Sequence, residues 1–576
     1  MYSQQQFLVR QWDFPRNSIS MNEPVRITFL GGLGDIGRNC AAIETQNQIL
    51  LLDCGQLFPD DLMPGAHSVL PDFSYLEKRR EKIIGCIATH GHEDHIGALR
   101  YALEICEFPI FGSEFTLGMV RHRLAEANML DKTELTKVED GEIISIGDFR
   151  CEFLPVTHST PKGLISAIHT PQGLILHSSD FKLDHSPVDG RVTDLDRIAD
   201  LSEDPGIRLL LCDSTNAELE GSSISESDVG TGLLGIFREF PQNRIITTCF
   251  SSHIHRIQQI INIARDEGRK VATLGFSLER NVSLARSLNI LKVPDDALID
   301  VAEIEHYPKS QVCVISTGSQ GEPRSSLCRS AQSSGKWLRI DEDDVIIFSS
   351  RTIPGNEKRI GRLVNNLLGL GAKVINDENL KTHTSGHGQR QELFELHKAA
   401  QPEWFVPVHG ELRHLMAHKQ LAVSNGMESG KALVATDGDQ IVMKDNELSL
   451  NREECKGQYI FSQGSIIEKG HGLFKERNIL GKEGCVIASV TVSTNDKCLK
   501  GPPVVISKGW LNEDLSRFYE DEVKEQLSKD LTLYLRHKDN LTHDRLTQKV
   551  RRITGSVVND RTKRRPMIVP IVEIIS

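Results

Sequence analysis

Long apolar runs are missing from this sequence of 576 residues, so no segment is expected to cross a bilayer as a helix. The first residues, MYSQQQFLVRQWDFPRN, also lack the basic and then apolar layout of a secretory signal. Hydrophobic residues make up 39% and charged residues 25%, which is typical of a soluble globular protein. A chain of this length exceeds one hydrophobic core and predicts roughly three or four domains.

Closely paired cysteines are absent as well. The twelve cysteines contain no CxxC pair, so the spacing that a zinc finger requires is not there. Several lie inside apolar runs, such as Cys86 in IIGCIAT and Cys212 in LLLCDST. This pattern indicates buried, reduced thiols and predicts a cytoplasmic protein.

An excess of positive charge is also missing, because the formal net charge is −12. Bulk charge alone therefore does not favour nucleic acid as a partner. Bound cations and a local basic surface facing the ligand would remove that objection. The charge leaves the class of partner open.

Internal repeats and low-complexity segments are absent too, and the chain consists of successive predicted strands and helices. Early strands end in polar residues: NQILLLDCG ends at Asp53, and KIIGCIATH ends at His90. Active sites gather at such edges because the sheet holds the strand ends rigidly. Farther along, strands and helices alternate, which predicts an inserted parallel α/β unit.

The order of predicted elements divides the chain into three domains, of which the first is discontinuous. After the insert, FVPVHGELRHL is again an apolar strand that ends in a histidine, as in the first part of the chain. The last stretch mixes strands with two helices. The predicted boundaries are 22–225 with 380–450 for the first domain, 226–379 for the insert, 451–465 for a polar linker and 466–576 for an α+β domain.

The segment THGHEDHIGAL places four metal-ligand residue types within six positions: His90, His92, Asp94 and His95. His90 and His92 are two apart, so they point the same way in extended chain. Asp94 and His95 follow as the chain turns into a predicted helix, where they can face a second ion. Two ions about 3.5–4 Å apart form the arrangement that activates a water for in-line displacement. The segment predicts a two-metal hydrolytic site rather than a surface loop.

This HxHxDH segment resembles the signature of the metallo-β-lactamase superfamily. The resemblance extends to later strand ends that carry His158 in PVTHST, Asp180 in HSSDFKLD and His409 in FVPVHGE. It implies two sets of metal ligands bridged by Asp180: His90, His92 and His158 for one ion, and Asp94, His95 and His409 for the other. It also implies that Asp53 supports the ligands from behind.

The inserted α/β unit resembles the β-CASP domain, which marks the branch of this superfamily that acts on nucleic acids. Its motifs match Asp213 in LLCDSTNA, His387 in THTSGHGQRQE and His409. Nearly the whole chain is further similar to the ribonuclease J family, through LGGLGDIGRN, DCGQLFPDDLMPG, PDFSYL, THGHEDHIGAL, DSTNAE, HIHRIQQ, STGSQGEP, SSRTIPGNE, HTSGHG, PVHGELRHL and RTKRRPMIVPI. The implied fold class is α/β, with a metallo-β-lactamase αββα sandwich, an inserted β-CASP parallel domain and a small C-terminal α+β domain.

The resemblance implies a metal-dependent ribonuclease with 5′-to-3′ exonuclease and possible endonuclease activity, which leaves 5′-phosphate products in RNA maturation and decay. Catalysis would use Asp94, Asp213 and His387, with His387 as proton donor or transition-state stabiliser and Asp213 fixing its tautomer. RNA would meet the loop of His383, Thr384, Ser385, Gly386 and His387, whose small residues let backbone N–H groups approach a phosphate. His387 as an ordinary turn histidine is the alternative.

The implied cofactors are two Zn²⁺ per subunit, with Mn²⁺ or Mg²⁺ as substitutes, because histidine-rich ligation favours zinc. The implied partner is single-stranded RNA with a 5′-monophosphate end. A homodimer or homotetramer and membership of an RNA-degrading complex are also implied, and no membrane is expected. Two alternatives stay open: a catalytically silent RNA-binding subunit, which the complete ligand set disfavours, and a β-CASP nuclease acting on DNA.

Weaker candidates stay divided between structure and function. Gly318, Ser319 and Gln320 in STGSQGEP could contact phosphate, although such turns are often only turns. His253 and His255 open a predicted helix, where serine capping and an RNA contact are both open. The basic run RTKRRP is a solvated surface, an oligomer contact or an RNA contact. The remaining histidines that we consider structural or solvent-facing are His169, His177, His414 and His418.

The sequence departs from the family pattern at three places. Ser178-Ser179-Asp180 stands where Thr-Gly-Asp is usual, so the turn is expected to be strained at the residue that replaces glycine. Two positions that are acidic in relatives carry His67 and Gln463 here. Because Ca²⁺ requires oxygen ligands, a structural calcium ion is predicted to be absent.

Overall fold

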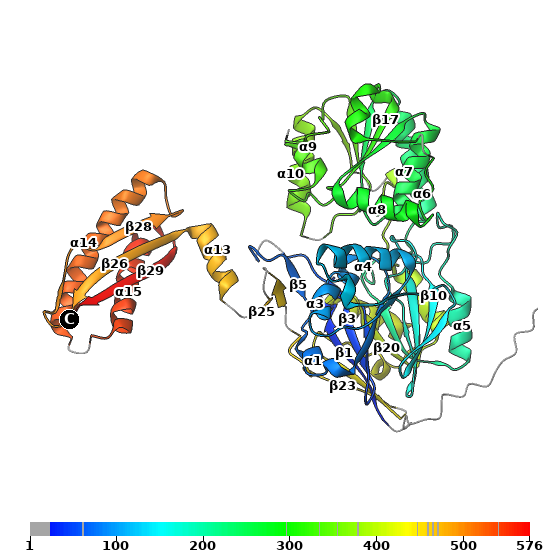
Figure 1. The fold of residues 1–576 in the computed structure, drawn as a ribbon, viewed down its shortest axis with the longest axis horizontal. Helices are drawn as coiled ribbons and strands as arrows, with labels where there is room; N and C mark the ends of the chain where they lie inside the picture. Colours follow the sequence, from blue (N-terminus) through cyan, green and yellow to red (C-terminus); the bar gives the residue numbers. More distant parts are fainter. Residues whose placement is uncertain are drawn as a thin grey trace, which may run out of the picture. The chain divides into compact units, whose positions relative to one another are not determined.

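The computed structural model describes residues 23–59, 63–294, 297–332, 334–353, 355–376, 380–445, 447–457, 460–462, 466–468, 472–538 and 541–575. These residues form two compact units. The first contains the described residues of 1–57 and 68–460, and the second those of 58–67 and 461–576. Figure 1 shows the chain coloured along its sequence.

Two β-sheets face each other in the first unit. The larger has the order β23-β22-β1-β3-β4-β6-β7-β8, and the smaller has the order β20-β13-β12-β11-β10-β9. Their strands are β1 (Val25–Gly31), β3 (Cys40–Glu44), β4 (Ile49–Leu52), β6 (Ile83–Ala88), β7 (Ile110–Gly112), β8 (Leu135–Lys137), β22 (Gln440–Lys444) and β23 (Glu447–Asn451) in the larger sheet, and β9 (Ile143–Ile146), β10 (Phe149–Pro155), β11 (Leu164–Thr170), β12 (Gly173–His177), β13 (Ile207–Asp213) and β20 (Trp404–Val408) in the smaller.

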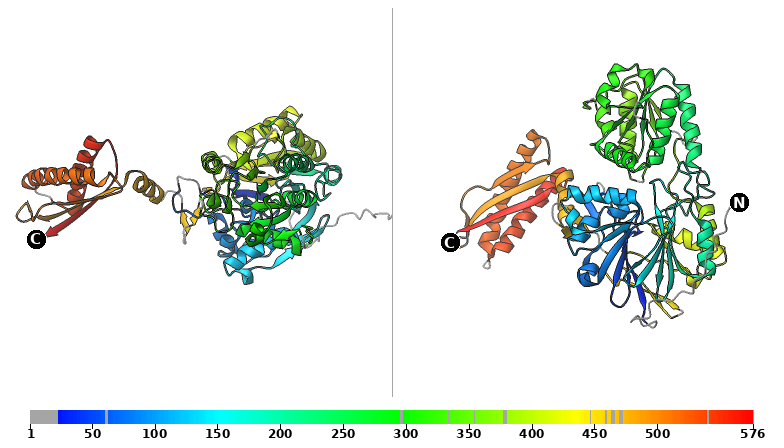
Figure 2. Two further views of the ribbon diagram at one scale, coloured as in Figure 1. Left: turned by 90° about the horizontal axis from the view of Figure 1, so that it is seen from above. Right: turned by 45° about the vertical axis from the view of Figure 1, so that its right-hand side comes forward.

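One hydrophobic core joins the two sheets, since Ile27 and Leu50 of the larger sheet and Phe153 and Leu211 of the smaller belong to the same buried cluster. Helices cover the outer faces. On the larger sheet they are α1 (Ser74–Glu77), α2 (Glu93–Ile96), α3 (Leu99–Leu103) and α4 (Glu114–Glu126), and on the smaller they are α5 (Leu195–Glu203), α11 (Arg390–Ala400) and α12 (Leu412–Ser424). The result is a four-layer αββα sandwich (Figures 1 and 2).

The insert carries a six-stranded sheet with the order β16-β15-β17-β14-β18-β19, in which every pair of neighbours is parallel. Its strands are β14 (Arg244–Thr248), β15 (Lys270–Leu274), β16 (Leu298–Ile299), β17 (Val312–Ser316), β18 (Asp344–Phe348) and β19 (Lys373–Ile375). Helices α6 (Glu226–Glu239), α7 (Ile254–Asp266) and α8 (Phe276–Ser287) cover one face, and α9 (Ser326–Ala331) and α10 (Glu357–Gly369) cover the other.

Amphipathic spacing explains why these helices pack as they do. In α10, Ile360, Leu363 and Leu367 are buried while the neighbours Lys358 and Arg362 are exposed. Apolar residues at i, i+3 and i+7 form one stripe, which the sheet covers. The two ends of the insert lie side by side, because Asn216 forms a β-bridge with Gln389 and the Thr384 hydroxyl donates to the carbonyl of Ile224 at 2.8 Å.

The second unit is an α+β domain. Its central strand β26 (Cys485–Ser493) pairs with β28 (Val504–Lys508) and, in parallel, with β29 (Met567–Ile575). The other elements are α13 (Leu473–Glu483), β27 (Cys498–Leu499), α14 (Glu513–His537) and α15 (His543–Thr562). Residues 58–67 also belong to this unit, where the Arg477 guanidinium donates to the carbonyl of Pro64 at 3.1 Å.

The predicted fold class is confirmed by these layers and sheets. The exact domain boundaries stay predictions. All twelve cysteines are free thiols. Within the described parts of the chain, no helix combines the length and the apolar character that crossing a bilayer demands.

Candidate metal centre

The predicted ligands gather at one edge of the sandwich, where strands of both sheets end. Each follows or closes a strand: Asp53 after β4, His90 after β6, His158 after β10, Asp180 after β12, Asp213 at the end of β13 and His409 after β20. Side chains from far-apart parts of the chain converge there because these strand ends share an edge. The seven predicted ligands form two overlapping groups whose ligand atoms lie within 4.8 Å of one another.

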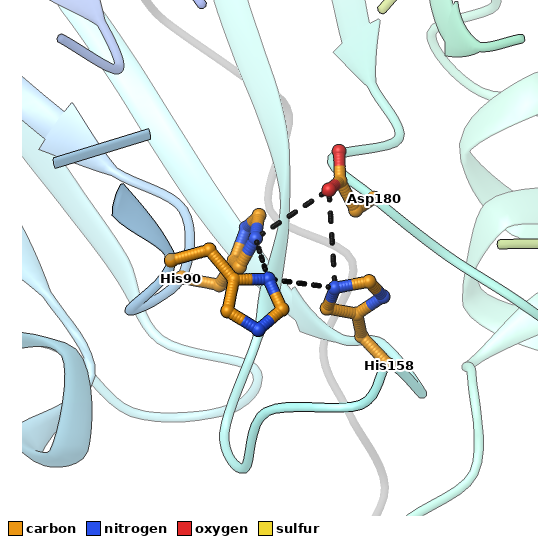
Figure 3. Close-up of side chains that lie close together, drawn as sticks. His90, His158 and Asp180 are labelled. Atoms are coloured by element: carbon orange, nitrogen blue, oxygen red, sulfur yellow. Dashed lines mark hydrogen bonds and ion pairs between the residues drawn. The ribbon is translucent and has the colours of Figure 1, made fainter. Parts of the chain in front are cut away.

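The first group consists of His90, His92, His158 and Asp180. The Nδ1 atom of His92 lies 3.1 Å from Nε2 of His90 and 3.1 Å from Nε2 of His158. Asp180 Oδ2 lies 3.5 Å from His90 Nε2 and 3.8 Å from His158 Nε2. Figure 3 shows the labelled His90, His158 and Asp180 pointing toward one another. Four ligands around a tetrahedral Zn²⁺ with bonds of 2.0–2.1 Å lie about 3.3 Å from each other, so the group fits zinc.

The second group consists of Asp94, His95, Asp180 and His409. Asp180 Oδ1 lies 3.2 Å from His95 Nε2 and 3.7 Å from His409 Nε2. Asp94 Oδ2 lies 3.2 Å from His409 Nε2 and 3.7 Å from His95 Nε2. These separations match the same tetrahedral edge of about 3.3 Å. Asp180 therefore presents one oxygen to each group, as a bridging carboxylate does.

Asp53 fixes the orientation of two neighbours. Its Oδ2 lies 2.7 Å from Nδ1 of His95, and its two oxygens accept from the backbone and hydroxyl of Thr89 at 2.8 and 2.9 Å. Since Nδ1–H of His95 donates to Asp53, Nε2 keeps its lone pair for the second group. His158 is set in the same way, with its Nδ1 2.7 Å from the carbonyl of Gly386.

A threonine connects the last ligand to Asp213. The Thr215 hydroxyl lies 2.7 Å from Nδ1 of His409 and donates to Asp213 Oδ1 at 2.8 Å. His409 therefore donates from Nδ1 to the threonine oxygen, and its Nε2 faces the second group. Ser252, from the insert, lies 3.1 Å from Nε2 of His92 and leaves Nδ1 of that ring for the first group.

His387 lies beside both groups. Its Nδ1 is 2.7 Å from Asp213 Oδ2, and its Nε2 is 4.0 Å from Asp180 Oδ2. Burial lowers the pKa of His387, but the charges of Asp213 and Asp180 outweigh burial and hold that pKa above its ordinary value. The geometry brings an imidazole whose pKa is raised next to the two ligand groups.

Burial lowers the pKa of the histidine ligands, and nearby carboxylates raise it. Burial lowers the pKa of His92 to about 4, so this ring is neutral and offers a lone pair. Burial also lowers the pKa of His409, but Asp180, Asp213 and Asp94 outweigh it and raise that pKa to about 10. A cation in the second group would have to displace this proton, so its binding weakens in acid.

Three residues around the site adopt the left-handed backbone region although none is glycine: Asp53 at φ 58°, Ser179 at φ 56° and His409 at φ 54°. Such conformations cost about 1–3 kcal/mol each and persist only where the surroundings fix them. The strain expected at Ser179 is therefore observed. The Ser178 hydroxyl donates to the carbonyl of Ser179 at 2.7 Å and accepts from the Asp213 amide at 3.0 Å, which holds this turn.

The loop predicted to meet the substrate lies next to the first group. A Cβ on Gly386 would stand 2.6 Å from Cε1 of His158, so only glycine fits there. The Ser385 hydroxyl accepts from the amide of His387 at 3.1 Å and from Nδ2 of Asn216 at 2.8 Å. Thr384 donates to the carbonyl of Ile224 at 2.8 Å, and Nδ1 of His383 is buried with no hydrogen-bond partner.

Other predicted residues have mainly structural contacts. The side-chain amide of Gln320 donates to the carbonyl of Arg351. The ring of His253 accepts from the backbone amide of Arg256. His253 therefore caps α7 in place of the serine that the sequence left open for this position. His418 is buried, with Nδ1 3.0 Å from the Ser214 hydroxyl.

Two further predicted residues have environments that the sequence did not indicate. His177 lines a cavity of about 30 Å³ together with His95, Asp180 and His409, and its Nδ1 has no hydrogen-bond partner. In the basic run, Arg564 donates to the carbonyl of Trp510 at 2.8 Å.

Of the two positions that bear on calcium, His67 is exposed, whereas Gln463 lies outside the described residues. The absence of calcium stays a prediction.

Sequence reasoning missed the residues that orient the ligands, namely Thr89, Thr215, Asn216 and Ser252. Asn216 Nδ2 donates to the carbonyl of His387 at 2.9 Å and so fixes the loop from the far side. Thr215 and Asn216 lie in the motif DSTNA, two and three positions after Asp213, and this motif is the signal that could have found them. Ser252 comes from the insert and carried no comparable signal.

The four-layer sandwich, the parallel insert between β13 and β20, and two donor groups that share an aspartate define a metal-dependent hydrolase of the metallo-β-lactamase fold with a β-CASP insert. Family models agree along the chain. A beta-lactamase superfamily domain matches residues 50–218, and the model described as "Ribonuclease J, beta-CASP domain" matches 242–367. A Zn-dependent metallo-hydrolase RNA specificity domain matches 378–431, and a ribonuclease J C-terminal domain matches 472–574.

The chain belongs to the ribonuclease J family, as the sequence predicted. It is 38% identical to ribonuclease J of Mycolicibacterium smegmatis over 551 residues, which cover 95% of this chain and 97% of that protein. It is 33% identical to ribonuclease J 2 of Staphylococcus aureus, over 96% of this chain and 99% of that one. A crystal structure of a protein of unknown function from Enterococcus faecalis shares the fold with a TM-score of 0.52 at 14% identity, over 73% of this chain and 100% of that chain.

Proposed function

We propose that the protein hydrolyses RNA phosphodiesters with two zinc ions per subunit and leaves 5′-phosphate products. We further propose that it combines 5′-to-3′ exonuclease activity, favoured by a 5′-monophosphate end, with internal cutting. One observation carries this proposal: two ligand groups with tetrahedral spacing share Asp180, and His387 lies directly beside them. Ribonuclease J of M. smegmatis, which is similar over nearly the whole chain, supports RNA as the substrate.

The donor set fits a pair of cations, which would supply an activated water and neutralise the charge on the phosphate oxygens. The residues of the chain orient the reactants. Asp53 and Thr215 hold His95 and His409 in fixed tautomers. Asp213 accepts from Nδ1 of His387, so the proton on Nε2 is the one that faces the ligand groups. His387 can then give this proton to the leaving oxygen.

Replacement of single histidines tests these roles. In His92→Ala, the first group loses the atom that lies 3.1 Å from both His90 and His158, so we expect loss of bound zinc and of cleavage together. His387→Ala should keep zinc and slow cleavage by about 10²–10⁴-fold, the range of general acid–base groups. His306→Ala, at an exposed position of the insert, is the matched control. Parental cleavage by His387→Ala would refute its role.

Digestion of matched substrates tests the activity itself. RNAs with a 5′-monophosphate, with a 5′-triphosphate and in circular form are compared with a DNA of the same sequence. We expect the 5′-monophosphate RNA to be degraded fastest and the circle to report internal cutting alone. Faster cleavage of DNA would favour the DNA nuclease. A preparation with two zinc ions per subunit that cuts none of these substrates would favour the silent RNA-binding subunit.

We also propose a homodimer or homotetramer built through the second unit, and membership of an RNA-degrading complex. The sheet of this unit supports an oligomer, because Val504, Ile506, Val569 and Ile571 are exposed on its strands. Exposed apolar patches of this kind mark interaction surfaces. A cytoplasmic location, supported by twelve free thiols, completes the proposal.

A further inference from the structure

Phe276 is an aromatic residue that the fold leaves in solvent. It is the first residue of α8, and 76% of its surface is exposed, the largest fraction among the big hydrophobic residues of the described chain. The chain reaches it through Gly275 at φ 133°, where a Cβ would stand 2.5 Å from the Thr317 hydroxyl. The backbone is therefore tightly held at a point where a large apolar ring gains nothing from the core.

The ring lies on the side of α8 that faces the sandwich. Phe276, Arg280 and Leu284 are spaced by four residues and share one face of the helix. Arg280 Nη1 donates to Glu126 at the end of α4 at 2.8 Å, and Leu284 contacts Gly118 of the same helix. Figure 1 shows α8 next to α4. Phe276 thus stands one helical turn before Arg280, which contacts the sandwich through Glu126.

The same helix is connected to the metal centre. Asn281 of α8 donates to the carbonyl of Ser251 at 3.1 Å, and the next residue, Ser252, contacts His92 at 3.1 Å. A helix rises 1.5 Å per residue, so Phe276 lies about 7.5 Å along the axis from Asn281. Phe276 follows β15 and Ser252 follows β14, so both come from the same end of the parallel strands, the end at which Ser252 contacts the sandwich.

Arg280 lies near the ring. Its guanidinium carbon is 5.9 Å from the centre of the Phe276 ring, and its ion pair with Glu126 anchors the arginine to α4. Most of the ring surface stays open to solvent. An exposed aromatic face is the feature that single-stranded nucleic acid uses for base stacking.

We propose that Phe276 is a stacking platform for one base of the RNA substrate, a few nucleotides from the phosphate that is cut. This inference rests on the proposed function, since it requires RNA to run past the junction of α4 and α8. Because every base has a π-face, the platform accepts all four bases and does not select a sequence. It adds affinity at one nucleotide position that lies outside the ligand groups.

An abasic scan tests the platform. The substrates are 5′-monophosphate RNA oligonucleotides in which a single abasic nucleotide is moved along the strand. With the zinc-loaded parent protein, we expect one position to raise KM by about 5- to 140-fold while kcat stays the same, since stacking contributes about that factor. Phe276→Ala should raise KM on intact RNA by the same factor and show no further penalty at that position. Phe276→Trp should keep the parental behaviour.

Trp337→Ala is the matched control. Trp337 is an exposed aromatic residue of the same insert, 43% exposed, and it precedes β18, so it lies at the opposite edge of the parallel sheet. The KM of Trp337→Ala should equal that of the parent. A parental KM for Phe276→Ala, or a penalty at the abasic position that is equal in parent and variant, would overturn the platform.

Failure of the proposed function can be told apart from failure of the platform. If the zinc-loaded parent cuts none of the oligonucleotides, the function is refuted, and the platform is then judged by equilibrium binding of the same RNAs. Weaker binding of intact RNA by Phe276→Ala, with the loss confined to one abasic position, would support the platform. Equal binding by parent and variant would overturn it.

Discussion

Arg256 of α7 joins the two points at which the chain enters and leaves the insert. It is fully buried, and its Nε and Nη2 donate to the two oxygens of Glu226 at 2.6 and 2.9 Å. Its Nη1 donates to the carbonyl of Thr382 at 2.9 Å and to that of Ser349 at 3.0 Å. Glu226 begins the insert and Thr382 follows it, so one guanidinium holds both ends.

We predict that Arg256→Met lowers the free energy of unfolding by about 3–5 kcal/mol, the cost of removing one partner from a buried ion pair. Glu226 is 5% exposed and would lose its one arginine, while Gln259, at 2.8 Å, and His253, at 3.5 Å, stay as polar neighbours. The double variant Glu226→Gln with Arg256→Met removes the stranded charge and should recover part of the loss. Thr382 directly precedes the loop 383–387, so RNA cleavage by folded Arg256→Met should also fall.

Urea unfolding at neutral pH, followed by circular dichroism, measures these differences. Arg238→Met is the matched control, because Arg238 on α6 is 65% exposed and its pair with Glu267 is a surface pair. Such pairs contribute about 0–1 kcal/mol. A loss below about 1 kcal/mol for Arg256→Met, or a double variant no more stable than the single one, would refute a buried charge pair as the link.

Three other variants are expected to separate structural from catalytic contacts. Burial lowers the pKa of His397 to about 4, so the folded chain binds this proton more weakly than the unfolded chain. Its contribution to stability is complete above pH 6.5 and is lost as pH falls toward 4, by about 2 kcal/mol at pH 5, and His397→Gln should remove that pH dependence in urea titrations. Thr215→Val removes the hydroxyl between Asp213 and the last ligand and should weaken zinc binding or activity about 10–100-fold, measured by zinc titration and cleavage rate. Gly386→Ala should displace His158 and lower zinc content, and full zinc with parental activity would contradict the contact.

Much of the metal centre was predictable because its ligands follow strands. The alternation of apolar strand and polar end marked Asp53, His90 and His409, and the structure brings these strand ends together. The groups that orient the ligands were not predictable in this way. Ser252 meets His92 across 160 positions, and although the motif HIHRIQQ follows it, no local pattern shows which distant side chain this serine contacts.

Local pattern carries no signal where a distant contact decides the structure. The described residues of 58–67 belong to the second compact unit, in which Pro64 accepts a hydrogen bond from Arg477 across 413 positions. The helix α13 (Leu473–Glu483) was not foreseen, because it has no residue that the fold buries fully and so lacks a clear apolar stripe.

The contact between Thr215 and His409 spans 194 positions and has a consequence for synthesis of the chain. A nascent chain that emerges as far as β19 has β13 without its neighbour β20, so the backbone of β13 is an open sheet edge. Such edges pair readily with other chains. Until His409 leaves the ribosome, the second ligand group also lacks a member, so the growing polypeptide is not yet able to cut the messenger from which it is translated.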